Sequence, residues 1–288
     1  MEVKGLIDLL TFSGIRRDAF LFLRNGPSKL DEIKEHLKLS TPEIQPQLKK
    51  LESNHMIEKV GDAYILTELG EIAAHYLEMF FETTTAIDSN NNFWEKHDLS
   101  VIPKKCLFNI KKLRSCSVAT TKNYKIGESH PDFIKNVHGA NKIKGVTSVI
   151  NPSWIGVFTT AASRNIQLEI VMTIDVYDEI LMEYPEKLEQ LLINKNSHIY
   201  ICDDDIRIAF ASMFGENGPF LSLGLHNKNT GCYDNQNDLE GHDLDAMEWG
   251  EELFEYYKEM SVEVEMTIEK NEFLIYEEKN KSIKIGYT

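Results

Sequence analysis

Side chains that could do chemistry are scattered along this 288-residue chain, and few have the spacing that a catalytic or metal site requires. Asp203, Asp204 and Asp205 follow an apolar run and could chelate a cation, although a charged turn after a strand explains them better. The chain has no G-x-S-x-G elbow and no G-x-G-x-x-G loop. We therefore predict no catalytic residue, no metal and no cofactor.

The cysteines are also spaced unlike a metal site, because no C-x-x-C pair and no histidine cluster at zinc-finger distance accompanies them. They are Cys106, Cys116, Cys202 and Cys232. We expect buried free thiols in a reducing compartment. No apolar run approaches the roughly 18 residues of a membrane span, and the opening segment lacks a small-residue cleavage site. We expect a cytoplasmic location.

A different group of side chains could contact nucleic acid. Ile44, Leu48 and Leu51 recur at helical spacing, so a helix over 41–53 would hold them inward and present its opposite face. A major groove admits one such helix, whose glutamine can read adenine and whose lysines can read guanine or grip phosphate. The predicted DNA contacts are Thr41, Gln45, Lys49, Lys50, Lys59, Arg16 and Arg17.

The elements around this helix form a winged helix-turn-helix pattern, in which two helices joined by a tight turn precede a hairpin. We expect helices at Val3–Phe12, Ile15–Leu23, Leu30–Leu37, 41–53 and 67–87, and strands at Met56–Val60 and Ala63–Leu66. The polar run Asp88–Asn92 is the predicted boundary. The first domain then covers 1–88 and includes a trailing linker or dimer helix.

The charge of this first domain is nearly balanced, with ten Lys/Arg against eleven Asp/Glu over residues 1–70. Strong DNA binders usually carry a basic face, and Pro42 and Pro46 take outward positions with residues that donate nothing. A protein-interaction or structural module is therefore an alternative. A dimer would let a neutral domain bind two half-sites together, with the apolar stripe of the 67–87 helix either at its interface or packed on its own domain.

Residues 93–288 alternate strands and helices, which indicates an α/β domain with a largely buried central sheet. The predicted strands are Ser117–Thr121, Val146–Ile150, Leu168–Thr173, Ile199–Cys202, Ile206–Met213 and Phe220–Leu225. The predicted helices are Pro103–Leu113, Asp132–Ala140, Ser153–Ser163, Asp175–Leu192 and Asp243–Met260. From Val262 to Tyr287 the alternation predicts a hairpin or meander. The whole chain is thus expected to be a multidomain α+β protein.

The net charge of -15 comes from this second half, with ten Lys/Arg against twenty-seven Asp/Glu over 146–288. It argues against a protein that coats nucleic acid or an anionic membrane over its whole surface. Residues 101–145 are the exception, with ten Lys/Arg against two Asp/Glu, and five of these basic side chains cluster on one predicted helix. These are Lys104, Lys105, Lys111, Lys112 and Arg114. They would either meet DNA beside the winged helix or pair with the acidic remainder of the chain.

The most specific motifs of the second domain are Ser222-Leu223-Gly224-Leu225, Tyr233-Asp234 and Trp249-Gly250-Glu251, and the first domain has Tyr64-Ile65-Leu66-Thr67 before Gly70. In these motifs the chain resembles the Fil-type methanogenesis regulators of methanogenic archaea. The resemblance covers nearly the whole chain and implies archaeal transcription control, with a winged helix followed by an effector-sensing domain. His226 stands where the family pattern has an aromatic Phe, which implies a different ligand if that position lines a pocket.

The α/β organisation is also similar to the phospholipase-D-like fold that some archaeal sugar-responsive regulators use as a sensor. Active enzymes of that fold need two H-x-K-x4-D motifs, because one histidine attacks phosphorus while the other protonates the leaving group. Here only His226-Asn227-Lys228 matches, Asp234 falls one place late and no second copy exists. A solvated loop after a strand explains the match better than half of a catalytic pair.

We therefore expect a sequence-specific regulator that binds double-stranded DNA as a homodimer and carries no catalytic site. Its 93–288 domain would bind an unknown small-molecule or protein effector, without the catalytic motifs of the phospholipase-D-like fold. The candidate effector contacts are Asn151, Thr173, Ser222 and His226. The alternatives are a degenerate phosphodiesterase-like enzyme and a sensor scaffold that does not bind DNA.

Overall fold

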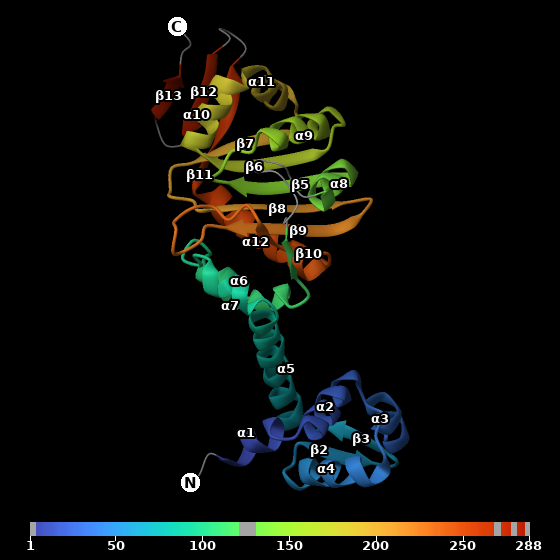
Figure 1. The fold of residues 1–288 in the computed structure, drawn as a ribbon. Helices are drawn as coiled ribbons and strands as arrows, with labels where there is room; N and C mark the ends of the chain where they lie inside the picture. Colours follow the sequence, from blue (N-terminus) through green and yellow to red (C-terminus); the bar gives the residue numbers. More distant parts are fainter. Residues whose placement is uncertain (1–3, 121–130, 268–271, 278–280, 286–288) are drawn as a thin grey trace. The chain divides into compact units, whose positions relative to one another are not determined.

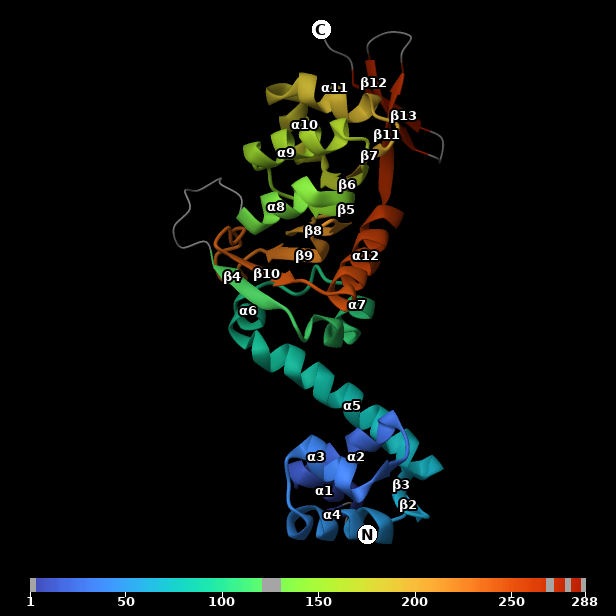
Figure 2. The ribbon, with the colours of Figure 1, turned by 90° about the vertical axis from the view of Figure 1, so that its right-hand side faces the viewer.

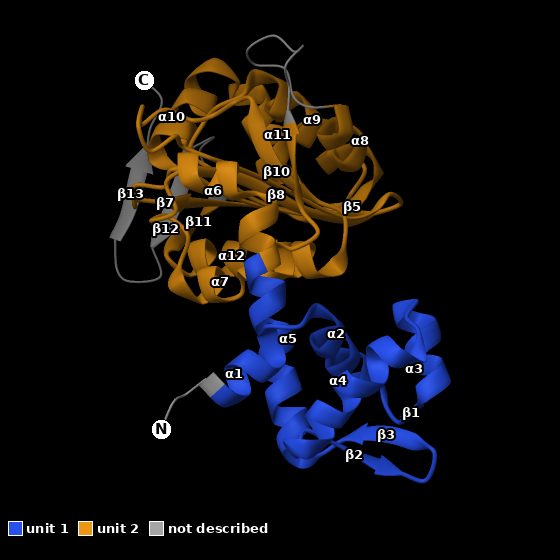
Figure 3. Cartoon of the chain, turned by 60° about the horizontal axis from the view of Figure 1, so that its bottom comes forward, with its two compact units in different colours: residues 1–84 blue, residues 85–288 orange. Residues whose placement is uncertain are grey.

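The computed structural model describes residues 4–120, 131–267, 272–277 and 281–285. Its contacts divide the chain into two compact units, residues 1–84 (unit 1) and residues 85–288 (unit 2), as Figure 3 shows. The division falls inside one long helix, α5 (Glu68–Ser89), just before the boundary predicted at Asp88–Asn92. None of the helices in these described ranges is both long enough and apolar enough to cross a membrane.

Unit 1 combines helices with a three-stranded antiparallel sheet in the order β1-β3-β2 (Figure 1). Its helices before α5 are α1 (Lys4–Thr11), α2 (Gly14–Phe22), the 3-10 turn η1 (Leu23–Asn25), α3 (Leu30–Leu37) and α4 (Thr41–Ser53). Its strands are β1 (Ser28–Lys29), β2 (Ile57–Val60) and β3 (Ala63–Leu66). The helices and the hairpin lie where the sequence predicts them. Strand β1 is an addition, and it pairs Ser28 with Tyr64.

The start of α5 is fixed by Thr67 and Gly70. The Thr67 hydroxyl donates to the His55 carbonyl at 2.7 Å and accepts from the Gly70 backbone N–H at 3.0 Å. A Cβ at Gly70 would lie 1.9 Å from the Met56 carbonyl oxygen, so only glycine allows this approach. The Tyr-Ile-Leu-Thr motif and its glycine therefore tie the wing to the long helix.

Unit 2 is built on a ten-stranded sheet in the order β13-β12-β11-β7-β6-β5-β8-β9-β10-β4. Its strands are β4 (Ser117–Thr120), β5 (Ala140–Thr147), β6 (Gln167–Thr173), β7 (Ser197–Cys202), β8 (Ile208–Gly215), β9 (Gly218–Leu225), β10 (Asn237–Gly241), β11 (Ser261–Thr267), β12 (Glu272–Glu277) and β13 (Lys281–Ile285). Strands β5, β6 and β7 are parallel and the remaining neighbours are antiparallel. Consecutive pairing of β11, β12 and β13 confirms the predicted C-terminal meander.

Helices cover both faces of this sheet (Figure 2). They are α6 (Asn91–Lys96), α7 (Lys104–Phe108), the 3-10 turn η2 (Ile110–Leu113), α8 (Pro131–Gly139), α9 (Pro152–Ser163), α10 (Ile174–Glu183), α11 (Pro185–Ile193) and α12 (Leu244–Glu259). Helices α8 to α11 share one hydrophobic core with the sheet. Helices α6, α7 and α12 share the other core, which uses the alternate side chains of the same strands. The predicted α/β layering of residues 93–288 follows from these two cores.

Three predicted elements of unit 2 are wrong in their bounds. The strand placed at Val146–Ile150 overlaps only the end of β5, which begins at Ala140 and has polar residues among the apolar residues of its first half. The single helix placed at Asp175–Leu192 is two helices, because Pro185 has no backbone N–H to continue α10. The helix placed at Pro103–Leu113 is the short α7 followed by η2.

The four cysteines are free thiols, and three of them are buried as predicted. Cys232 is the correction, because it lies exposed in the polar loop after β9. Burial raises the pKa of Cys106 to about 11 and that of Cys116 to about 12. Both thiols therefore stay protonated near neutral pH, where a thiolate would be needed for reactivity.

Candidate nucleic-acid interface and ligand pocket

Helix α4 has one packed face and one free face. Ile44, Leu48 and Leu51 are all 0% exposed in the core of unit 1. Gln45, Lys49 and Lys50 are exposed, as the helical spacing predicts. The helix is therefore held by its apolar side while donors project from its opposite side, which is the arrangement a groove-reading helix needs.

The first turn of α4 is held by a capping interaction. The Ser40 backbone N–H and hydroxyl donate to one Glu43 carboxylate oxygen, at 2.8 and 2.6 Å. These hydrogen bonds lower the pKa of Glu43. Thr41 is the first helical residue and is half-buried. A carboxylate at this helix start satisfies free N–H groups and fixes where the outward side chains begin.

Two of the remaining predicted DNA contacts, Lys59 and Arg17, differ in how far they interact with other residues of unit 1. Lys59 lies exposed on β2, with its ammonium 5.6 Å from the centre of the Tyr64 ring. Arg17 is half-buried, pairs with Asp18 at 2.8 Å and lies 4.7 Å from the Phe81 ring centre. Its guanidinium is thus partly occupied within unit 1.

Arg16 is a correction to the predicted set. It is only 8% exposed. Its Nη1 donates to the Leu9 carbonyl at 2.7 Å and its Nε donates to the Gln47 side chain at 3.0 Å. A buried guanidinium with such partners joins α1, α2 and α4 and is not placed to hold phosphate. The predicted DNA contact of Arg16 rested on residue type alone, and the burial of this side chain contradicts it.

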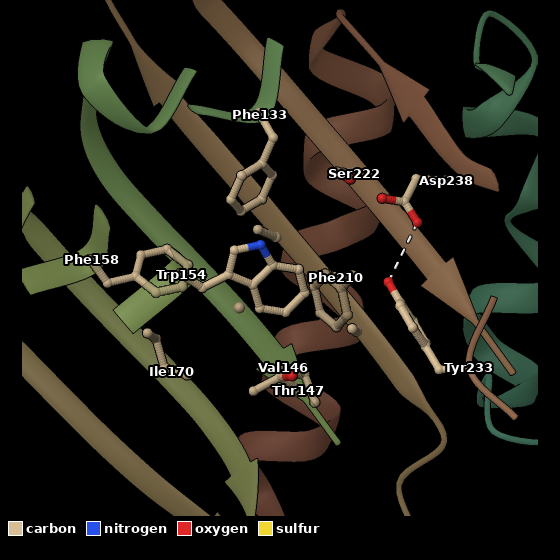
Figure 4. Close-up of a pocket in the computed structure, with 13 residues that line it drawn as sticks. Phe133, Val146, Thr147, Trp154, Phe158, Ile170, Phe210, Ser222, Tyr233 and Asp238 are labelled. Atoms are coloured by element: carbon tan, nitrogen blue, oxygen red, sulfur yellow. Dashed lines mark hydrogen bonds between the residues drawn. The ribbon is translucent and has the colours of Figure 1, made fainter. Parts of the chain in front are cut away.

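A narrow pocket opens in unit 2 between α8, α9 and the sheet (Figure 4). Its aromatic walls are Phe133 from α8, Trp154 and Phe158 from α9, and Phe210 from β8. The Phe133 ring lies 5.7 Å from Trp154 and 6.3 Å from Phe158, between ring centres. Ser222, Tyr233 and Asp238 form the polar end of the pocket.

The polar end is a buried carboxylate with hydroxyl donors. Tyr233 donates to Asp238 at 3.4 Å, and Ser222 also hydrogen-bonds that carboxylate. Burial raises the pKa of Asp238 to about 6, and the charge of Asp234 adds to this rise, while the two hydroxyl donors oppose it. Burial likewise raises the pKa of Glu240 to about 7. The pocket therefore has one negative end whose ionisation is costly without a cation.

The motifs that carry the sequence resemblance build this polar end. A Cβ at Gly224 would lie 2.1 Å from the Tyr233 hydroxyl oxygen and 2.6 Å from Asp238. Glycine at this point of β9 leaves room for both side chains. Gly250 has a related role on α12, where a Cβ would lie 2.7 Å from Leu221 of β9. These glycines permit close packing that larger residues would prevent.

The predicted effector contacts meet this pocket only in part. Ser222 lines it. Asn151 caps α9 by accepting from the Ser153 N–H at 3.0 Å, and it lines a second, apolar cavity that shares Trp154 with the first. Thr173 caps α10. His226 contacts the Gly231 carbonyl at 3.1 Å, and neither it nor Thr173 lines either cavity.

Sequence reasoning missed the residues that dominate the pocket. Trp154 and Phe158 are four positions apart on one helix, a spacing that places both on the same face and could have singled them out. Asp238 had no such signal, because the polar run of β10 was not recognised as a strand. Tyr233 was noted only as part of a family motif.

The partial phosphodiesterase motif does not assemble a site. Lys228 is exposed, and His226 hydrogen-bonds within its own loop. Asp234 lies 3.2 Å from Nε2 of the buried His97. Asp203, Asp204 and Asp205 are exposed, and across the described residues no group of three His, Cys, Asp or Glu is placed to hold a metal ion.

Two of the five basic residues after the linker, Lys112 and Arg114, pair with α12. Lys112 contacts Glu248 at 3.2 Å and Glu252 at 2.9 Å, and Arg114 contacts Asp245 at 2.7 Å. Lys142 and Lys144 on β5 make further pairs with Glu251 and Glu255. Of the two interpretations left open by the sequence, pairing with the acidic remainder is therefore favoured for Lys112 and Arg114.

Comparison with known proteins gives two domain matches of one family. The model described as "Methanogenesis regulatory protein FilR1, N-terminal domain" matches residues 4–85, and the "middle domain" model of the same protein matches residues 126–260. The chain is 24% identical over 263 residues to "Methanogenesis regulatory protein FilR1" of Methanothrix harundinacea (strain 6Ac). That alignment covers 90% of this chain but 58% of the relative, so the chain spans little more than half of the relative's length.

Among solved structures, the chain is similar to TrmBL2, described as an archaeal chromatin protein with a novel mode of DNA binding. The identity is 11%, the TM-score is 0.40, and the match covers 91% of this chain and 99% of that one. A TM-score this low does not establish a shared fold. The two domain matches, in order along the chain, confirm the resemblance drawn from the motifs, and the chain belongs to the FilR1 methanogenesis regulatory protein family.

Proposed function

We propose that this protein regulates transcription by binding double-stranded DNA sequence-specifically through α4, and that an effector bound in unit 2 modulates this binding. The observation that carries the proposal is the two-sided character of α4. Leu48 and its apolar neighbours are fully buried, while Gln45, Lys49 and Lys50 are exposed. In a major groove the lysines would reach guanine or phosphate and Gln45 would reach adenine.

A homodimer is the second part of the proposal, and α5 supports it. Four large apolar side chains on this helix are more than half exposed: Leu69, Ile72, Tyr76 and Phe80. They recur at intervals of three and four residues, so they form one stripe on the helix surface. The predicted stripe divides here, because Ala73 and Leu77 pack on the core of unit 1 while Tyr76 and Phe80 face outward. A second copy would cover this outward stripe and place two α4 helices on a palindromic operator.

Replacing Tyr76 by glutamate should therefore weaken the dimer, because it puts a charge into a stripe that association would bury. Tyr76 is 67% exposed, so the change costs the monomer little. Analytical ultracentrifugation over a concentration series should show at least a tenfold rise in the dimer dissociation constant. Glu71→Gln, a change of one charge at an exposed position on a different side of the helix, is the matched control. An equal effect of both substitutions would exclude this stripe as the interface.

One loop of unit 2 could transmit the binding of an effector, because it contacts both the pocket and the end of α6. Residues 226–236 carry Tyr233 of the pocket wall. The same loop receives the Asp98 N–H at the His226 carbonyl, at 2.9 Å, and its Lys228 N–H donates to the Lys96 carbonyl at 3.0 Å. A ligand that shifts Tyr233 would thus act on the segment that ends α6, and α6 follows α5 directly in sequence.

The DNA-binding proposal is tested by comparing two lysines. Lys49→Ala should lower affinity for a selected operator fragment roughly tenfold or more, because a base or phosphate contact is worth about 1–3 kcal/mol. Lys228→Ala, an exposed lysine in unit 2, is the control and should bind like the wild type. Fluorescence anisotropy at rising salt measures both, and wild-type affinity should fall steeply with salt. Equal affinities of the two variants would refute the placement of the reading helix.

The other interpretations gain less support. A phosphodiesterase-like enzyme has only the His226 and Lys228 half-motif, and these two side chains do not converge on a pocket. A sensor scaffold without DNA binding would give no salt-dependent, sequence-preferring affinity in the same titration. The likeness of unit 2 to a phospholipase-D-like sensor stays a prediction.

A further inference from the structure

We propose that the pocket of unit 2 binds an organic ammonium ion with an apolar substituent, with Asp238 as its counter-ion and Trp154 in its aromatic wall. This names the chemical class of the effector and so rests on the proposed function of unit 2. The inference comes from the combination of one carboxylate with aromatic rings in a single pocket. Neither feature alone would select a ligand.

The carboxylate sets the sign of the ligand's charge. Asp238 is accompanied by Tyr233 and Ser222, which donate hydrogen bonds but bring no positive charge. Within the described part of the chain, no lysine, arginine or histidine lines this pocket. The negative charge of Asp234 acts on Asp238, and the charge of Asp238 in turn helps to raise the pKa of Glu240. A cation would relieve this unfavourable ionisation, whereas a carboxylate or phosphate ligand would increase it.

The aromatic residues favour an organic cation over a hydrated metal ion. Figure 4 shows Trp154 beside Phe133, Phe158 and Phe210, with Asp238 and Tyr233 at another side of the pocket. Ring faces attract an ammonium group, and they also bury the carbon atoms attached to it. A metal ion would instead need several oxygen ligands, and among the residues that the structure describes Asp238 is the one carboxylate in this lining.

The neighbouring cavity indicates where the apolar substituent would lie. Its lining is almost wholly apolar and includes Ile155, Met172 and Leu188. It shares Thr147, Trp154, Phe158 and Ile170 with the pocket, so the two spaces adjoin beneath α9. The two spaces hold about 30 and 40 Å³ as they stand, so the lining side chains would have to move for an alkyl group to extend from the ammonium at Asp238 into the second space and gain hydrophobic burial.

Three probes of equal chain length separate the effect of charge from that of apolar bulk: hexylammonium, 1-hexanol and hexanoate. Isothermal titration of the full chain at pH 7.5 should show hexylammonium binding at least tenfold more tightly than hexanol, with no saturable binding of hexanoate. Equal affinity for hexylammonium and hexanol would overturn the proposal. So would the absence of saturable hexylammonium binding.

Asp238→Asn should weaken hexylammonium binding at least tenfold and leave hexanol binding unchanged, because it removes the charge and keeps the shape. Asp203→Asn, at an exposed acid after β7, is the matched control and should bind like the wild type. Trp154→Leu should lower the affinity for both hexylammonium and hexanol. Unchanged hexylammonium affinity in Asp238→Asn would refute Asp238 as the counter-ion.

The pH dependence of hexylammonium binding to the wild-type protein tests the same ion pair without any substitution. With the pKa of Asp238 at about 6, the carboxylate is mostly ionised at pH 7.5 and mostly protonated at pH 5. Hexylammonium affinity should therefore fall about tenfold between these values, while hexanol affinity stays constant. Tyr233, Asp234 and Glu240 are the other titratable groups that act on this carboxylate or are affected by it. Affinity independent of pH would count against the ion pair.

The failure of this inference is distinguishable from failure of the proposed function. The salt titration with operator DNA is carried out on the same preparation without ligand. Intact DNA binding with no ammonium binding would remove the ligand class alone. Absent DNA binding would remove the regulator proposal, whatever the pocket binds.

Discussion

Replacing Leu48 by alanine should lower the free energy of unfolding of unit 1 by about 2–5 kcal/mol, the usual cost of a large-to-small change in a core. Leu48 is fully buried in the same core as Phe20, Ile33 and Ile44. The substitution removes apolar contacts and leaves a cavity that the surrounding helices fill only in part. Because Leu48 also orients α4, DNA affinity should fall with stability.

Urea unfolding of the full chain is monitored through hydrogen exchange of the α4 amides. Tryptophan fluorescence would not report on unit 1, because the three tryptophans all lie in unit 2. Lys49→Ala is the matched control, one residue away on the exposed face. It should change stability by no more than about 0.5 kcal/mol. A Leu48→Ala protein as stable as this control would show that the inner face of α4 is not packed as described, and the case for its outer face would fail too.

The winged-helix part of the fold could be predicted because its signals are local. The spacing of Ile44, Leu48 and Leu51 defines the buried face of α4 without reference to any distant residue. The turn at Gly61-Asp62 places the wing in the same way, and Gly61 has a positive φ of 61°. Arg16 shows the limit of such reasoning, because only the packing of three helices decides that it is buried.

The pocket could not be predicted, because it depends on strands that pair across long stretches of sequence. Asp238 lies on β10, which is held between β9 and β4 and contains Asn, Asp, Glu and Gly in five residues. Such a composition is typical of a turn, and only pairing with distant strands makes it a strand. The aromatic wall likewise combines α8, α9 and β8, whose proximity follows from the sheet order.

The family motifs were predictable from the sequence only in part. Their residues were recognisable in the sequence, but their physical roles became clear only in three dimensions. Gly70 admits the Met56 carbonyl, and Gly224 admits Tyr233 and Asp238. Both glycines are thus required by close approach at the points where the wing and the pocket are built. A resemblance based on these positions therefore reports on the two surfaces proposed to act.

Replacing Trp249 by alanine should lower the free energy of unfolding of unit 2 by about 3–5 kcal/mol, in the range for removing a buried aromatic side chain. Trp249 is fully buried on α12, and its indole N–H donates to the Cys106 carbonyl at 2.9 Å. The change leaves a large cavity in the core formed by α6, α7 and α12, and it removes one of the two donors to that carbonyl, which also accepts from the Asn109 N–H at 3.0 Å. Urea unfolding, monitored by the fluorescence of Trp94 and Trp154, measures this loss of stability.

Two further variants separate the ring from its hydrogen bond. Trp249→Phe keeps most of the apolar contact but loses the donor to Cys106, so its loss of stability should be smaller than that of the alanine variant. Tyr256→Ala removes a 40% exposed ring from the same helix and should cost less than either. If Trp249→Ala were no worse than Tyr256→Ala, α12 would not be packed on β8 and β9 through Trp249.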